Sequence, residues 1–320
     1  MRWLVRITAI AVLAGAVYVG FIVAANVGID VADFSAHAAP MSLDDYMALD
    51  GPAPSEHIAY GSAPSQFVEL FEPKGQGPFP VVFLVHGGCW QASLAGIKQM
   101  HNMAGALAAR GIAVWNVEYR RIDEPGGGYP GTYEDINAAF DLIAAKANTY
   151  RLDTSRIVAM GHSAGGHLVQ WLAGRARLPK TSPLTDSAPV HLGAVISLGN
   201  LADLSGQKER IRNVCDVDVK SLTGSPSAVR PDVFRDTNAA ALMPNGSHMI
   251  LINGALDRIS PPSVAENYAA LARRAGDSAE TLVLPDASHF DEVSATSPAW
   301  KLILPVIEKG LAPKPINPAR

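Results

Sequence analysis

The stretch RIVAMGHSAGGHLVQWLAG, residues 156–174, sets one serine between a strand-like and a helix-like segment. Four apolar residues, 157–160, precede the turn, and Leu168, Trp171 and Leu172 recur after it at helical spacing. Residues 161–165 follow the pattern G-x-S-x-G, in which the serine occupies a sharp strand-to-helix turn and small neighbours let the backbone pack closely. The pattern predicts a nucleophile elbow at Ser163.

The segments on either side of this stretch alternate between strands and helices. Such alternation predicts a mostly parallel central sheet with helices on both faces. A helix is predicted over residues 132–147, with Thr132 as its cap and Asp135 three residues on. Residues 200–247 show no clear alternation, and we expect them to form an insertion over the carboxyl edge of the sheet. The strands are predicted at residues 66–73, 80–88, 112–119, 192–199, 248–254 and 280–285.

A serine hydroxyl is a weak nucleophile and needs a base that an acid orients. Functional side chains of a parallel sheet lie beyond the carboxyl ends of its strands. Asp257 and His289 each follow a strand, and the order Ser163, Asp257, His289 is the order expected for this architecture. Asp286 is the rival acid, and Asp257 could instead cap the next helix. The remaining histidines are expected to be structural, His162 and His167 among them.

The segment VHGGCW, residues 85–90, also ends a strand. Its adjacent glycines allow backbone N–H groups to turn toward the serine. We expect the N–H groups of Gly88, Cys89 and Ala164 to form an oxyanion hole, in which one donor is typically worth about 2.7–4 kcal/mol. Trp90, the loop at residues 124–131 and the insertion are expected to line the substrate pocket.

Composition excludes several classes of protein. The net charge is −4 and no basic run exceeds two residues, so we expect no nucleic-acid partner. The two cysteines, Cys89 and Cys215, have no metal-ligand spacing, so we predict no metal site. A disulfide between them cannot be read from the sequence. We expect none, because Cys89 lies in the tight glycine loop.

The amino-terminal segment differs from the rest of the chain. Arg2 and Arg6 precede an uncharged apolar run at residues 7–29, long enough for a membrane helix. We therefore expect residues 1–40 to be a cleaved export signal or a membrane anchor, with the remainder exported or held at the membrane. Residues 41–64 are predicted to be a linker, residues 65–312 the catalytic domain and residues 313–320 a tail.

Together these motifs resemble the α/β-hydrolase superfamily over residues 65–310. HGGCW is similar to the HGGxW signature of the kynurenine-formamidase-like branch, related to esterases and lipases whose loop reads HGGG. VEYR (117–120), GHSAGGHL (161–168) and ASHF (287–290) also resemble that branch. The resemblance implies Ser163 as nucleophile, His289 as base and Asp257 as orienting acid, with no cofactor.

Three functions are consistent with these residues. The first is hydrolysis of a small carboxylic ester through an acyl-enzyme. The second uses the same residues to cleave an aryl formamide. The third is a hydrolase-fold binding protein without catalysis, which the complete Ser-His-Asp set disfavours. The acyl and alcohol groups and the oligomeric state are not encoded in these motifs.

Overall fold

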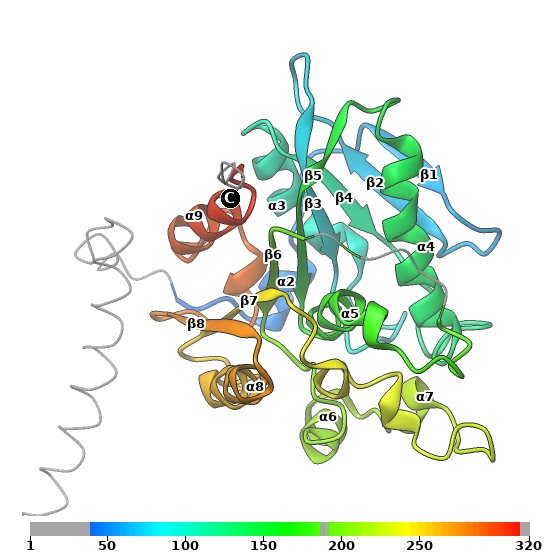
Figure 1. Cartoon of the computed structure of the whole chain (residues 1–320). Coiled ribbons are helices and arrows are strands. Elements are labelled where there is room, and N and C mark those ends of the chain that lie inside the picture. The colour runs from blue at the N-terminus through cyan, green and yellow to red at the C-terminus, as the bar shows by residue number, and fades with distance from the viewer. Residues whose placement is uncertain (1–38, 186–189, 191, 314–320) are drawn as a thin grey trace, which may run out of the picture.

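The computed structural model describes residues 39–185, 190 and 192–313. One eight-stranded sheet runs through the molecule in the order β1-β2-β4-β3-β5-β6-β7-β8 (Figure 1). β1 and β2 are antiparallel to their neighbours, and the other strands pair in parallel. The strands are β1 (Glu56–Ala59), β2 (Phe67–Phe71), β3 (Phe79–Val85), β4 (Ala113–Val117), β5 (Leu152–His162), β6 (Ala194–Leu198), β7 (His248–Gly254) and β8 (Ser278–Leu284).

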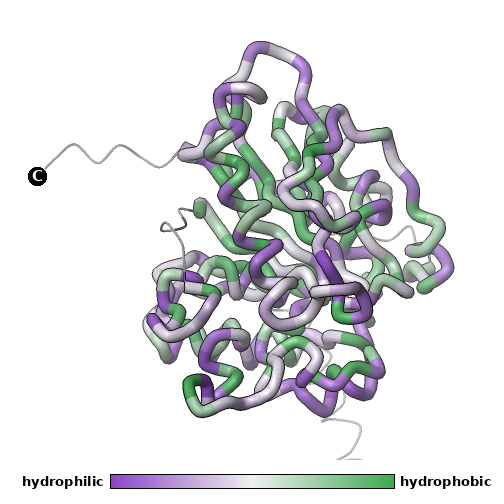
Figure 2. The backbone as a smooth tube through the Cα atoms, turned by 90° about the vertical axis from the view of Figure 1, so that its right-hand side faces the viewer, coloured by the Kyte–Doolittle hydropathy of each residue, from purple (hydrophilic) through white to green (hydrophobic). Residues whose placement is uncertain are grey.

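The central strands are apolar on both faces because both faces are covered. Every residue of β4 and β6 is buried, as expected of strands in the middle of a parallel sheet. Figure 2 shows hydrophobic segments gathered in the interior and many of the hydrophilic segments in the outer loops. The predicted mostly parallel sheet is therefore confirmed.

Two sets of helices cover the sheet. α4 (Gly131–Lys146), α5 (Ala164–Ala173) and α8 (Pro262–Ala275) contribute to one hydrophobic cluster. α2 (Leu43–Met47), α3 (His101–Ala108) and α9 (Trp300–Gly310) contribute to a second cluster on the opposite face. Both sets can be followed in Figure 1. The two layers hold the sheet rigid, so the loops beyond its carboxyl edge start from fixed positions.

The predicted linker at residues 41–64 is wrong. This segment contains α2, whose Tyr46 is buried in the second cluster, and β1, which pairs with β2 at the sheet edge. Its prolines and glycines lie between these elements, and the apolar side chains of Tyr46 and Ile58 anchor it. The folded domain therefore begins before residue 65.

The predicted cap of the helix after β4 is also wrong. α4 begins at Gly131 with Pro130 as its N-cap. The Thr132 hydroxyl instead donates to the Arg120 carbonyl oxygen, and Asp135 accepts hydrogen bonds from the Arg120 backbone and guanidinium. Both side chains thus hold the loop after β4 rather than the helix terminus.

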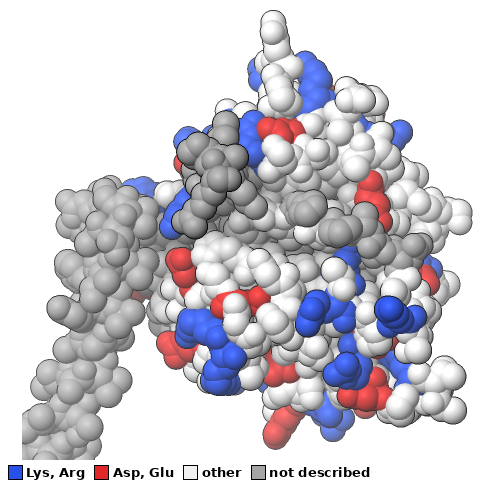
Figure 3. Space-filling view, in the orientation of Figure 1, with Lys and Arg blue, Asp and Glu red and all other residues white. Residues whose placement is uncertain are grey.

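The segment at residues 200–247 begins at the carboxyl edge of the sheet, where the insertion is predicted, and its last residues return to the amino end of β7. The segment contains α6 (Lys208–Cys215) and α7 (Lys220–Thr223). Gln91, after β3, donates to the Cys215 carbonyl oxygen at 2.9 Å, and the Ser260 hydroxyl, after β7, donates to the Asn200 carbonyl oxygen at 2.7 Å. Figure 3 shows basic and acidic side chains side by side over the lower part of this face, where α6 and α8 lie.

The predicted export signal or anchor falls almost wholly on residues 1–38, outside the described part of the chain, as do residues 314–320 of the tail. Among the described residues, no helix combines the length and apolar character needed to cross a bilayer.

Candidate active site

Ser163 occupies a strained turn between β5 and α5. Its φ of 52° and ψ of −115° are uncommon for a residue with a side chain. The Ser163 N–H donates to the Leu198 carbonyl oxygen at 2.7 Å, which ties the turn to the end of β6. A Cβ added at Gly165 would lie 2.2 Å from the Val85 carbonyl oxygen, and one at Gly161 would lie 2.2 Å from the Gly165 carbonyl oxygen. Only glycine therefore permits this close packing.

Asp257 and His289 form a buried hydrogen-bonded pair. Nδ1 of His289 lies 2.7 Å from Oδ2 of Asp257, and the side chains of both residues are almost fully buried. The N–H groups of Ile259 and Ser260 donate to the other Asp257 oxygen at 2.7 and 2.8 Å. Burial raises the pKa of Asp257, but the hydrogen bond and charge of His289 and the two backbone donors outweigh it and hold that pKa below its usual value. Asp257 is therefore an ionised acid that orients the imidazole.

His289 packs against the residue next to Ser163 in the chain, at one edge of the sheet. His162, next to Ser163 in the chain, bonds through Nε2 to the His289 carbonyl oxygen at 3.0 Å, and the two imidazole rings lie 4.5 Å apart. A Cβ at Gly199, after β6, would lie 2.4 Å from Cε1 of His289. The ends of β5, β6, β7 and β8 thus converge on His289. The rival acid, Asp286, is exposed, whereas Asp257 is the acid bonded to His289.

The loop after β3 turns its backbone toward the serine. Gly88, Cys89 and Trp90 have positive φ values of 98°, 52° and 56° in succession. The preceding residue, Gly87, is packed so tightly that an added Cβ would lie 3.0 Å from Cβ of Ser163. Consecutive residues of this kind form a concave set of N–H groups that suits an anion. Within the described residues, the N–H groups of the three predicted donors, Gly88, Cys89 and Ala164, donate no loop, turn or cap hydrogen bond.

Cys89 and Cys215 form a disulfide, so the expectation of two unpaired cysteines is wrong. Their Cα atoms lie 5.5 Å apart, within the usual range. The side chain of Cys89 thereby reaches Cys215, the last residue of α6. Gln91 donates to the Cys215 carbonyl oxygen beside the bridge. The proposed oxyanion loop is therefore tied to the insertion by one covalent bond and one hydrogen bond.

Loss of this disulfide is expected to destabilise the fold. The bridge joins residues 126 apart in the chain. A crosslink over so long a loop restricts the unfolded chain, so removal should lower the free energy of unfolding by about 2–4 kcal/mol. Urea unfolding of the wild type with and without dithiothreitol measures the effect. The Cys89→Ser/Cys215→Ser double variant is the control and should not respond to the reductant. Equal midpoints for the oxidised and reduced wild type would contradict the prediction.

Trp90 lies in the core behind the loop. Its side chain is fully buried, and its ring makes an edge contact with His167 at 5.7 Å between centroids. The Trp90 carbonyl oxygen accepts from the Ile122 N–H at 2.8 Å, so the residue also fixes the loop after β4. Contact between Trp90 and a substrate stays a prediction.

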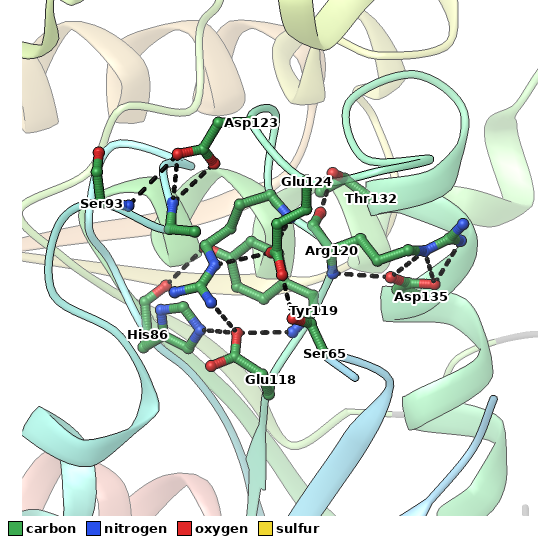
Figure 4. Close-up of polar contacts among 12 residues, drawn as sticks. Ser65, His86, Ser93, Glu118, Tyr119, Arg120, Asp123, Glu124, Thr132 and Asp135 are labelled. Carbon is green, nitrogen blue, oxygen red and sulfur yellow. Dashed lines mark hydrogen bonds and ion pairs between the residues drawn. The ribbon is translucent and has the colours of Figure 1, made fainter. Parts of the chain in front are cut away.

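A second buried pair, not predicted from the sequence, lies at the start of the loop after β3 (Figure 4). Nε2 of His86 lies 2.8 Å from the Glu118 carboxylate, and the His86 ring stacks on Tyr119 at 4.6 Å. Burial raises the pKa of Glu118, but His86, Arg121 and the Tyr119 N–H outweigh it and lower that pKa overall. Both residues lie in motifs quoted above, HGGCW and VEYR. Their adjacency follows from the parallel pairing of β3 with β4.

His162 and His167 are buried and neutral, as expected of structural histidines. Burial, helped by the charge of His289, lowers the pKa of His162 to about 3. Burial lowers the pKa of His167 to about 4, against the raising effect of its hydrogen bond to the Thr237 carbonyl oxygen. Neither ring is suited to act as a base near neutral pH.

Acid should destabilise the protein through His167. In the unfolded chain this histidine takes up a proton near pH 6.5, whereas the folded protein resists protonation down to about pH 4. The contribution of the neutral His167 to the free energy of unfolding is therefore lost as pH falls. The loss amounts to about 2 kcal/mol between pH 7.5 and pH 5. His167→Gln keeps an N–H donor for Thr237 but does not titrate. Between those pH values, urea unfolding should show the wild type losing about 2 kcal/mol relative to this variant. Parallel losses would contradict the prediction.

Three buried side chains, those of His162, His289 and Glu292, have potential metal-ligand atoms within 4.8 Å of one another. One nitrogen of each histidine is already hydrogen bonded, His162 to the His289 carbonyl oxygen and His289 to Asp257. Glu292 in turn accepts from the Gly254 N–H, so all three side chains belong to the hydrogen-bonded network around His289.

Comparisons with curated proteins identify esterases. A probable isoprenylcysteine alpha-carbonyl methylesterase from Oryza sativa subsp. japonica is 28% identical over 247 residues, which cover 73% of this chain and 57% of that protein. Esterase EstD from Thermotoga maritima is 31% identical over 137 residues, covering 40% of this chain and 33% of EstD. The chain thus spans little more than half the length of the first of these relatives, and a smaller part of the second.

Solved structures share the fold. Esterase B from Lactobacillus rhamnosis (HN001) superposes with a TM-score of 0.70 at 20% identity, over 91% of this chain and 95% of that chain. The family model BD-FAE matches residues 68–270, which include the elbow, the loop after β3 and Asp257. The chain therefore belongs to the BD-FAE family, a family of α/β-hydrolases.

Proposed function

We propose that this protein is a serine hydrolase that cleaves small carboxylic esters. The observation that carries the proposal is the convergence of Ser163, in its strained turn, with the Asp257–His289 pair at the carboxyl edge of the sheet. The names of the relatives, a methylesterase and EstD, support an ester as the substrate.

The proposed reaction has two acyl-transfer steps. Nε2 of His289 accepts the proton of Ser163 as the serine oxygen attacks the ester carbonyl carbon. The carbonyl oxygen becomes negatively charged and is stabilised by the N–H groups of Gly88, Cys89 and Ala164. The protonated imidazole then donates its proton to the departing alcohol. Water, deprotonated by His289, attacks the acyl-enzyme, releases the acid and restores the serine hydroxyl.

The same residues could cleave an aryl formamide, with an arylamine as the leaving group in place of the alcohol. The HGGCW segment supports this alternative, because it resembles the signature of the kynurenine-formamidase-like branch. Of the two substrates we favour the ester, since the two relatives described above are named as esterases.

A fluorophosphonate probe and a substrate panel test the proposal together. The probe should label the native protein, and mass spectrometry of the digest should place the adduct on Ser163. The panel compares 4-nitrophenyl acetate, butyrate and octanoate with N-formylkynurenine. We expect turnover of at least one ester above that of the formamide. A faster formamide reaction would favour the alternative, and absence of both labelling and turnover would reject a serine hydrolase.

We also propose that the protein works outside the cytoplasm. Two features support this location: the apolar run at residues 7–29, preceded by two arginines, and the Cys89–Cys215 disulfide, since such bonds persist in oxidising compartments. Fractionation of cells that express the full chain tests it. A soluble exported product whose amino-terminus follows residue 29 indicates a cleaved signal. Full-length protein that stays with membranes after alkaline extraction indicates an anchor, and an intact chain in the cytoplasm would reject both.

A further inference from the structure

Glu292 is a buried carboxyl group that the proposed reaction does not use. It lies in a short 3-10 turn (Asp291–Val293) directly after the His289 segment, and it is fully buried. Oε1 accepts a hydrogen bond from the Gly254 N–H at 2.7 Å, at the end of β7. Oε2 has no partner of normal hydrogen-bond geometry among the described residues. A ring nitrogen of His289 and one of His162 lie within 4.8 Å of the carboxyl group.

The neighbours of Glu292 determine where the negative charge resides. Burial, followed by the charge of Asp257, raises the pKa of Glu292 well above its usual value, and the charge of Asp291 adds to the effect. Asp257 has three donors, namely the His289 ring and the N–H groups of Ile259 and Ser260. Glu292 accepts from one donor, the Gly254 N–H, and the neighbouring His162 is neutral. Two adjacent buried carboxyl groups cannot both ionise at low cost, so Asp257 carries the charge and Glu292 the proton.

We propose that Glu292 is a positioning residue that acts as an uncharged carboxylic acid behind the Asp257–His289 pair. Its carbonyl oxygen accepts from the Gly254 N–H, and its hydroxyl group at Oε2, which has no other partner among the described residues, is available to donate to the neighbouring Asp257 carboxylate. The residue thereby joins the His289 segment to the strand end that leads to Asp257. A neutral acid does this without placing a second negative charge beside the imidazole. This inference rests on the proposed function for its kinetic consequences only.

Two substitutions test the charge and the hydrogen bond separately. Glu292→Gln keeps the shape, an acceptor for Gly254 and a donor for Asp257, without a titrating group. Glu292→Met keeps the approximate volume and removes both. We expect the Gln variant to retain kcat/KM within about threefold, and the Met variant to lose about tenfold or more, mainly in kcat. Glu280→Gln, at an exposed position of β8, is the control and should match the wild type.

The pH profile separates positioning from a simple structural role. The acid limb of kcat/KM reports protonation of the catalytic base. If Glu292 is uncharged, the Gln variant keeps the midpoint of that limb, whereas the Met variant raises it because Asp257 loses a donor. If Glu292 were ionised, the Gln variant would remove a negative charge near His289 and lower the midpoint by about one to two pH units. That shift, or a Met variant equal to the wild type in kcat and midpoint, would overturn the proposal.

A stability measurement tests the proton on Glu292 without any activity. A carboxyl group whose pKa is raised by folding stabilises the protein at low pH and loses that contribution as pH rises above its unfolded value. Relative to Glu292→Gln, the wild type should therefore show a free energy of unfolding in urea that decreases from pH 5 to pH 8. The slope should be that expected when the folded protein binds about one proton more than the unfolded chain. A slope of zero would overturn the inference even if the ester chemistry holds. An inactive wild type with the expected slope would reject the proposed function alone.

Discussion

Ser163→Ala is expected to lower kcat for ester hydrolysis by about six orders of magnitude, the loss seen when a serine hydrolase loses its nucleophile. The effect is large because the proposed acyl-enzyme forms on the Ser163 hydroxyl, which alanine lacks. The alanine variant should fold, since Ser163 is tied down through its backbone N–H to Leu198. The measurement is the initial rate with the best ester of the panel, under single-turnover conditions where the rate is very low.

Ser155→Ala is the matched control, because Ser155 is exposed and bonds to Asp153 far from the site. It should keep the wild-type rate and the fluorophosphonate adduct on Ser163. Turnover of the Ser163→Ala variant at more than about a thousandth of the wild-type rate would mean that another group performs the chemistry. In that case the elbow would serve only as a turn.

Asp257→Asn is expected to lower kcat by about four orders of magnitude with little change in stability. The Asn oxygen can still accept from the N–H groups of Ile259 and Ser260, so the loop keeps its shape. The Asn amide nitrogen, a hydrogen-bond donor, would then face Nδ1 of His289 in place of the accepting Asp257 oxygen. The imidazole would respond by placing its proton on Nε2, and it could not accept the proton of Ser163.

The pH profile and a second variant check this result. Asp286→Asn makes the same chemical change at an exposed position that also follows β8 in the chain, and its kcat should stay within about twofold of the wild type. The Asp257→Asn variant should recover part of its activity at high pH, where hydroxide replaces the missing base. A large loss in Asp286→Asn with a small loss in Asp257→Asn would exchange the roles of the two acids.

The strand and helix pattern was sufficient to predict the central elements, because buried parallel strands appear as short apolar runs. It failed at residues 41–64, where only Tyr46 and Ile58 are buried and the rest of the segment is exposed or partly exposed. It also failed at Thr132, whose side chain bonds to Arg120 in the preceding loop. Local chemistry cannot reveal that a polar side chain has a better partner in another part of the chain.

By itself, the sequence determined the position of the serine turn and the candidate acid and base. The spacing of glycines and the chain order of strand ends are local properties, and a parallel sheet brings all its carboxyl ends to one edge. Only the tertiary structure decided the contacts between segments. These are the bond of His289 to Asp257 and not to the rival Asp286, the disulfide between Cys89 and Cys215, and the position of Glu292 next to the Asp257–His289 pair. These contacts depend on distances of a few ångströms between elements far apart in the chain, and no periodicity within one segment encodes such distances.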